Sequence, residues 1–263
     1  MKLSLSNIGW DTEHNERICS LMSDLGYYGL EIAPSAVFGE NPYDKMNETQ
    51  SYAESVKDKY FLNIVSIQSI WYKRPEMLFG SDERDRQFLT EYTKKAIDFA
   101  ESLGCMRIVF GNPKNRKKGK SFSKKVSNDF FNTIGDYASV KGIKICLEAN
   151  PVIYGTDFIN TTKEAAELCK ELNSDGICIN LDIGTVIAND ESLSTIDEVI
   201  SLIGHVHVSE PMLKPVIKRS LHCELKSILS ANNYNGCISV EMAKTGKIED
   251  IEEAAYYLKE VFG

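Results

Sequence analysis

Four segments of the chain end a short apolar run with a side chain that can bind a metal ion. Apolar runs of this length, such as the one between Gly142 and Pro151, indicate buried strands. The segments are 143–148 (IKICLE), 177–182 (ICINLD), 203–207 (IGHVH) and 237–241 (CISVE). Three carboxylates gathered with an imidazole would repel one another unless a divalent cation neutralised them. The pattern therefore predicts a metal site formed by Glu148, Asp182, His207 and Glu241.

The donor set also indicates which ion is expected. Carboxylate oxygens with one imidazole suit Mn²⁺ or Mg²⁺, with Co²⁺ and Zn²⁺ as alternatives. Taken singly, each carboxylate has a simpler interpretation, as a helix cap or a surface charge. Recurrence at four corresponding strand ends favours the metal site. His205 shares a strand face with His207 one pleat deeper, so we expect it to be a hydrogen-bonded core residue.

Strand-like runs alternate with amphipathic helical stretches along the whole chain, which predicts repeated β-α units and a parallel sheet. The predicted strands are 3–8, 28–32, 61–67, 106–110, 143–148, 177–181, 203–208 and 237–241. The predicted helices are 13–25, 47–59, 82–103, 124–141, 162–172, 193–202, 221–232 and 248–261, the second with an Asn47 cap. No linker interrupts the series, so residues 1–263 are expected to form one domain, a (β/α)₈ TIM barrel of the α/β class.

A closed barrel is favoured over an open sheet because it leaves no unpaired edge strand. An open dinucleotide-binding sheet would carry a Gly-rich turn after the first strand, whereas residues 7–10 read NIGW. Barrel active sites lie at the carboxyl ends of the strands. Glu31 and Gln68, near the ends of the second and third strands, therefore join the candidate site residues.

Composition excludes several functional classes. A formal net charge of −8 argues against a nucleic-acid partner, because such binding depends on clustered Lys and Arg. One basic run, 114–120 (KNRKKGK), is either a solvated loop or a lid over an anionic substrate. Seven scattered Cys without a CxxC pair indicate reduced thiols, and no signal peptide or membrane span is evident. We expect a cytoplasmic protein with no membrane partner.

The order of the four predicted ligands on strands five to eight resembles the xylose isomerase-like barrel superfamily, particularly sugar isomerases and epimerases of the tagatose 3-epimerase type. Family-like segments are 29–34 (GLEIAP), 148–150 (EAN), 154–161 (YGTDFINT), 180–184 (NLDIG), 205–210 (HVHVSE) and 238–242 (ISVEM). The resemblance covers the whole chain. It implies that Glu148 and Glu241 are both metal ligands and the catalytic acid/base pair, while Asp182 and His207 hold the ion. It also implies a homo-oligomer.

The implied chemistry is removal of a proton next to a carbonyl, with a divalent ion stabilising the enediolate. Proton return to the opposite face makes an epimer, and return to the adjacent carbon makes an aldose or ketose isomer. The expected partner is a small sugar or sugar phosphate, with Lys73, Arg74 and the basic run as candidate phosphate contacts. The expected substrate contacts are Glu31, Gln68, Trp71, Asn150, Tyr154, Thr185, Glu210 and Lys214. Trp10, Trp71, Tyr72 and Tyr154 are candidate stacking aromatics.

Three positions depart from the family pattern. Thr185 and Tyr154 stand where a substrate-binding His and Glu are common. The usual Arg after strand seven has no clear match, although Lys214, Lys218 and Arg219 are near. A non-catalytic sugar-binding barrel is therefore the alternative function. A type IV apurinic endonuclease is a lesser alternative, since its three-metal site needs more His than the four present. His222 either faces solvent or supports the site from behind.

Overall fold

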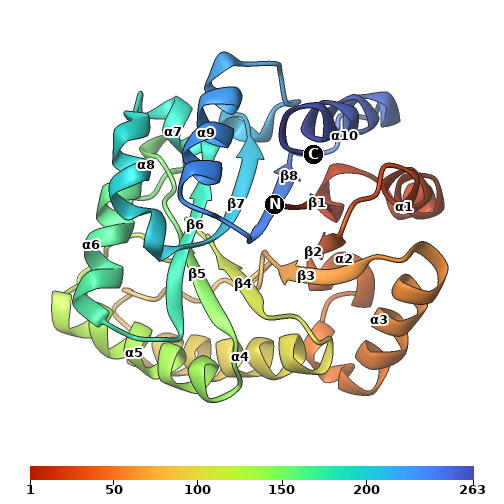
Figure 1. Ribbon diagram of the computed structural model, residues 1–263. Helices are drawn as coiled ribbons and strands as arrows, with labels where there is room; N and C mark the ends of the chain where they lie inside the picture. Colours follow the sequence, from red (N-terminus) through yellow and green to blue (C-terminus); the bar gives the residue numbers. More distant parts are fainter.

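Eight parallel strands close into a barrel in which each strand pairs with the next along the chain and β8 pairs with β1 (Figure 1). The computed structural model describes residues 1–263. The strands are β1 (Lys2–Ser6), β2 (Gly29–Ile32), β3 (Asn63–Ile67), β4 (Arg107–Phe110), β5 (Lys144–Glu148), β6 (Ile177–Asp182), β7 (Ile203–Ser209) and β8 (Cys237–Glu241). The predicted fold class, a (β/α)₈ barrel, is confirmed.

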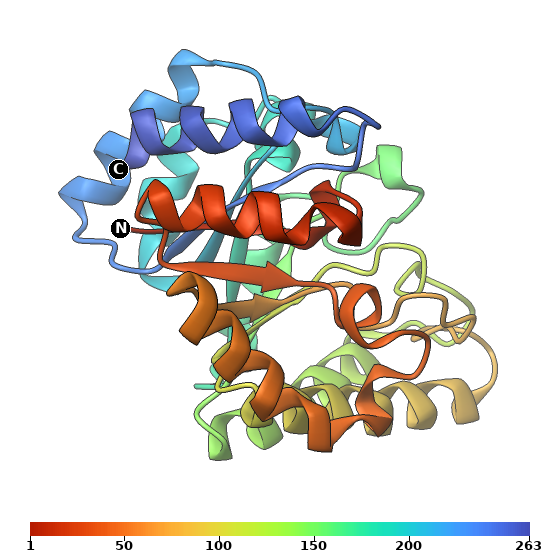
Figure 2. The ribbon, with the colours of Figure 1, turned by 90° about the vertical axis from the view of Figure 1, so that its right-hand side faces the viewer.

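Helices surround the barrel and return the chain from each strand to the next (Figures 1 and 2). The longer ones are α1 (Asn15–Asp24), α3 (Met46–Tyr60), α4 (Glu83–Ser102), α5 (Lys124–Val140), α6 (Thr162–Leu172), α8 (Leu193–Val199), α9 (Ser220–Ala231) and α10 (Ile248–Phe262). Figure 2 shows α1 and α10 side by side, where Arg17 and Glu252 form an ion pair at 2.6 Å. None of the helices has the combination of length and hydropathy that a membrane span needs.

Short helical segments lie between the strands and the longer helices, and all but the one directly before β7 follow a strand at the barrel mouth. Two are α-helical, α2 (Pro34–Phe38) and α7 (Ile183–Ala188), and six are 3₁₀ turns. The 3₁₀ turns are η1 (Asn7–Gly9), η2 (Thr12–His14), η3 (Pro42–Asp44), η4 (Val152–Tyr154), η5 (Ile200–Leu202) and η6 (Pro211–Leu213). The predicted helices did not include α7, which begins directly after Asp182. The Asp182 side chain caps this helix by accepting a hydrogen bond from the Thr185 amide.

Two predicted element starts are wrong for local reasons. Asn47 lies inside α3, which begins at Met46 and has Lys45 at the N-cap without a side-chain hydrogen bond. Phe61 belongs to the end of α3 and not to β3, because it adopts a left-handed conformation with φ of 59°. That conformation ends the helix and leaves the Phe61 side chain 78% exposed.

The interior of the barrel is unusually polar. Barrels of this kind normally fill their interior with bulky branched residues, but here the buried positions along the strands include polar and charged side chains. They are Ser4, Ser6, Glu31, Ser66, Gln68, Asn180, His205 and Ser239. Hydrogen bonds join them across strands, for example from Gln68 Nε2 to Ser6 Oγ at 2.7 Å. The hydrophobic core instead lies between the barrel and its helices, so the interior forms a polar support beneath the barrel mouth.

Candidate active site

The four predicted metal ligands lie together at the carboxyl end of the barrel. Glu148 ends β5, Asp182 ends β6, Glu241 ends β8, and His207 lies within β7 in register with Asp182. One ligand atom from each residue lies within 4.8 Å of all the others. All four side chains are buried. The strand register thus brings together residues that are up to 93 positions apart, from Glu148 to Glu241.

Each carboxylate in this group is oriented by donors from neighbouring elements. Asn180 and Asn150 donate from their Nδ2 atoms to the two oxygens of Glu148, at 2.7 and 2.9 Å. Asp182 accepts hydrogen bonds from the Thr185 amide and hydroxyl, both at 2.8 Å, and from the Ser209 hydroxyl. These bonds fix the directions in which the remaining lone pairs point.

His207 connects the carboxylate group through one ring nitrogen. Its Nδ1 lies 3.1 Å from Glu241 Oε2 and 3.3 Å from Glu148 Oε1. Three carboxylates and an imidazole nitrogen that converge in this way fit a divalent cation such as Mn²⁺ or Mg²⁺. Glu148, Asp182 and Glu241 would supply oxygens, and His207 would supply Nδ1.

The electrostatics of the group agree with this fit. Burial, with repulsion from Glu148, raises the pKa of Asp182 to about 6, and burial raises the pKa of Glu241 to about 7. Burial opposes protonation of His207, but the attraction of Glu31 and Glu241 outweighs it and raises the His207 pKa well above its usual value. Without a cation the group therefore retains protons, which a divalent ion would displace.

A cavity of about 180 Å³ lies above the group. Glu148, Asp182 and Glu241 line it, and so do three of the predicted substrate contacts, Gln68, Asn150 and Tyr154. The Tyr154 hydroxyl accepts a hydrogen bond from the Met212 amide at 2.8 Å, which holds the ring at the mouth. Apolar walls come from Ile8, Val109, Pro113 and Leu213.

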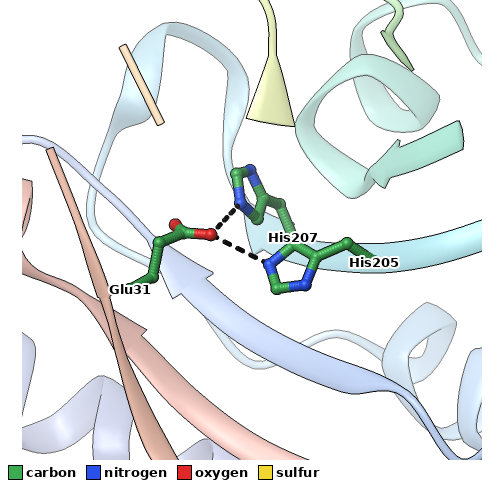
Figure 3. Close-up of side chains that lie close together, drawn as sticks. All are labelled: Glu31, His205 and His207. Carbon is green, nitrogen blue, oxygen red and sulfur yellow. Dashed lines mark hydrogen bonds and ion pairs between the residues drawn. The ribbon is translucent and has the colours of Figure 1, made fainter. Parts of the chain in front are cut away.

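Glu31 lies below the cavity and not in it, contrary to prediction. It is the penultimate residue of β2, and its side chain is wholly buried inside the barrel. Figure 3 shows Glu31 Oε2 facing the Nε2 atoms of His205 and His207, at 2.9 and 3.1 Å. The structure therefore places Glu31 outside the cavity lining.

Four other predicted substrate contacts also lie away from the cavity. Trp71 is buried, donates its indole N–H to Thr93 at 3.0 Å and packs edge-on against Phe110. Thr185 is buried behind Asp182, and the Lys214 side chain is exposed outside the cavity. Strand-end position alone did not reveal which of these side chains turn inward to the core and which point outward to solvent.

Glu210 is the fourth of these residues, and it forms an ion pair with Arg219. Two hydrogen bonds of 2.7 and 2.6 Å join the carboxylate to the guanidinium group. The structure also contradicts the stacking role predicted for Trp10, and it excludes the solvent-facing alternative for His222. Trp10 is buried and bonded to Asn15, and His222 is buried with Nδ1 2.9 Å from the Tyr257 hydroxyl, so it does not face solvent.

Arg116 is a site residue that the sequence analysis missed. The other cations of the basic run, Lys114, Lys117, Lys118 and Lys120, are exposed, as the solvated-loop interpretation predicted. Arg116 is fully buried, and its Nη2 donates to the Glu148 carbonyl and to Asn150 Oδ1, both at 2.6 Å. It therefore links the loop after β4 to the end of β5. The one signal in the sequence is its residue type: it is the only Arg among four Lys in the run, and a guanidinium suits buried hydrogen bonding better than an ammonium group.

Comparisons with known proteins agree on the fold. The sequence profile described as xylose isomerase-like TIM barrel matches residues 19–261. A D-psicose 3-epimerase structure superposes with a TM-score of 0.78 at 18% identity, covering 100% of both chains. The 3-keto-D-glucoside 4-epimerase of E. coli gives 0.77 at 16% identity and 99% of both chains. A D-tagatose 3-epimerase-like protein gives 0.78 at 20% identity, covering 99% of this chain and 97% of the other. No curated protein matches by sequence.

Replacing the buried arginine tests its structural role. We expect Arg116→Met to lower the free energy of unfolding by about 2 kcal/mol, because two buried acceptors lose their donor. Urea denaturation measures this change. Lys117→Met, one residue along and exposed, is the matched control and should change stability by less than about 0.5 kcal/mol. Equal effects of the two changes would contradict the assignment.

The raised pKa of Glu241 predicts a pH dependence of stability in chelator-treated protein. Between the ordinary value of 4.5 and about 7, the folded chain keeps a proton that the unfolded chain has released. The free energy of unfolding therefore falls as the pH rises through this range. In urea denaturation, the free energy of unfolding of wild-type protein minus that of the Glu241→Gln variant should fall between pH 4.5 and pH 7. Glu224→Gln, at an exposed position, is the control for the loss of one carboxylate. A wild-type advantage over Glu241→Gln that rises with pH would refute the prediction.

Proposed function

The chain belongs to the xylose isomerase-like TIM barrel family, and we propose on this basis that it is a metal-dependent isomerase or epimerase of small sugars. The observation that carries the proposal is the convergence of Glu148, Asp182, Glu241 and His207 Nδ1 on one point at the cavity floor. The similarity in fold to sugar 3-epimerases and a 4-epimerase supports it. The arrangement provides both an ion site and carboxylates beside it.

We assign the proton transfers to Glu148 and Glu241. Both line the cavity, and they come from different strands, β5 and β8. A carboxylate on each side of a bound sugar can remove a proton from a carbon next to the carbonyl and return one to the other face. A divalent ion bound beside them would supply the positive charge that stabilises the enediolate. Asn150 and Asn180 hold Glu148 in position through its two oxygens.

The substrate we propose is an uncharged monosaccharide and not a sugar phosphate. No Lys or Arg lines the cavity, whereas three carboxylates do, so a phosphate group would meet net repulsion. The sequence had suggested Lys73, Arg74 and the basic run as phosphate contacts. Lys73 instead lies 3.5 Å from Glu40, and Arg74 lies over the Tyr92 ring. Hydroxyl groups would find partners in Gln68, Asn150 and Tyr154.

Metal binding is the first property to test. Wild-type protein should bind Mn²⁺, and Glu148→Gln and Glu241→Gln should each weaken binding at least about tenfold, because each removes a charged ligand. Titration with detection of free Mn²⁺ by electron paramagnetic resonance gives the dissociation constants. Exposed Glu253, changed to Gln, should match wild type. Equal affinities in all four proteins would refute the ligand assignment.

Catalysis is tested by isotope exchange. Mn²⁺-loaded protein in deuterated water should introduce deuterium next to the carbonyl of at least one ketose or aldose in a panel, and mass spectrometry detects the label. The corresponding sugar phosphates should remain unlabelled, because no Lys or Arg lines the cavity to bind a phosphate group. Labelling of phosphates alone would overturn the substrate class. If no compound in the panel is labelled although the protein binds a sugar, the alternative of a non-catalytic sugar-binding barrel is favoured.

A further inference from the structure

We propose that Glu31 is a positioning residue that fixes the His207 ring so that its Nδ1 faces the metal site. The proposal rests on the metal site proposed above and extends it one layer deeper into the barrel. Glu31 touches neither the cavity nor the three carboxylates of the ligand group. Its direct contact with the ligand group is with His207 Nε2, at 3.1 Å.

The two nitrogens of the His207 ring have different partners. Nδ1 faces Glu241 and Glu148 at 3.1 and 3.3 Å, whereas Nε2 faces Glu31 Oε2 at 3.1 Å (Figure 3). A nitrogen that binds a metal carries no proton, so the other nitrogen of a neutral ring carries it. The carboxylate beneath the ring thus selects the tautomer with a proton on Nε2. That tautomer leaves the Nδ1 lone pair directed at the three ligand carboxylates.

Glu31 is itself held rigidly. Besides His207, its oxygens accept hydrogen bonds from Ser66 Oγ at 2.6 Å and Gln68 Nε2 at 3.1 Å, and His205 Nε2 lies 2.9 Å away. A wholly buried carboxylate is costly unless donors of this kind satisfy it. Because both imidazoles meet the same oxygen, with ring planes 82° apart, the carboxylate has little freedom to rotate. A fixed acceptor in turn limits rotation of the His207 ring.

A second metal ion among Glu31, His205 and His207 is the competing interpretation of these contacts. The ligand atoms of these three residues lie close enough together to hold an ion. However, the separations of 2.9 and 3.1 Å between Glu31 Oε2 and the two nitrogens are those of direct hydrogen bonds. Ser66 also occupies the same oxygen. Hydrogen bonding therefore accounts for every contact of Glu31 Oε2, without an additional ion.

The test is the affinity of the folded protein for Mn²⁺ alone. Glu31→Gln should weaken binding by about 10- to 100-fold, the usual effect of removing a partner of a metal-binding imidazole, because a neutral amide is a weaker acceptor. Glu210→Gln is the matched control. Glu210 is also a buried carboxylate with charged donors, from Arg219, and it does not contact the ligand group. The dissociation constant of the Glu210→Gln variant for Mn²⁺ should lie within about threefold of the wild-type value, even if the variant is less stable.

A second measurement needs no variant. The chain has four His, so ¹⁵N-histidine labelling gives a simple nuclear magnetic resonance spectrum of Mg²⁺-loaded wild-type protein. His207 should carry its proton on Nε2, and a proton on Nδ1 would overturn the proposal. If the Glu31→Gln variant binds Mn²⁺ with the affinity of wild type, the positioning role of Glu31 is also refuted, whereas the metal site itself stands. Wild-type protein that binds neither ion would refute the metal site itself, and this proposal with it.

Discussion

The structure depends on keeping four carboxylates buried inside one barrel. Glu31, Glu148, Asp182 and Glu241 are each less than one tenth exposed, and such groups are stable only when donors or cations compensate them. The compensation comes in two layers. In the lower layer Glu31 is paired with two imidazoles and two neutral donors. In the upper layer hydroxyls, amides and one imidazole nitrogen face three carboxylates, an arrangement that the proposed divalent ion would complete.

The polar barrel interior follows from this constraint. A core of branched aliphatic residues would offer the carboxylates no hydrogen bonds, so the strands carry Ser66, Asn180 and His205 where such barrels usually carry Val or Ile. The buried apolar side chains lie instead between the strands and the surrounding helices. His207 joins the two layers because each of its ring nitrogens serves one of them. Stability and ligand geometry are thus provided by the same side chains.

Much of the fold and the centre of the site could be predicted from sequence. The alternation of strands and helices is a local pattern, and the repeated strand endings identified Glu148, Asp182, His207 and Glu241 as one group. The remaining site residues depend on non-local geometry. Trp71 follows a strand end but packs into the core, Glu31 enters one layer below the rim, and Arg116 is the only buried cation of the basic run. Composition and spacing carry no information on these directions.

Arg116 also bears on how this barrel can diversify. Loops at the carboxyl ends of barrel strands usually vary independently of the scaffold, which lets one fold acquire many specificities. Here the loop after β4 is tied by a buried guanidinium to the backbone of Glu148 and to Asn150. Changes in its length or path would be transmitted directly to the carboxylate that β5 presents. The segments around Tyr154 and Leu213 also border the cavity, but the Tyr154 hydroxyl and the Leu213 carbonyl each meet only a backbone amide, of Met212 and Ala243. Side chains there can change without removing a buried charged link to Glu148, so we expect altered specificity to be engineered most readily in these two segments.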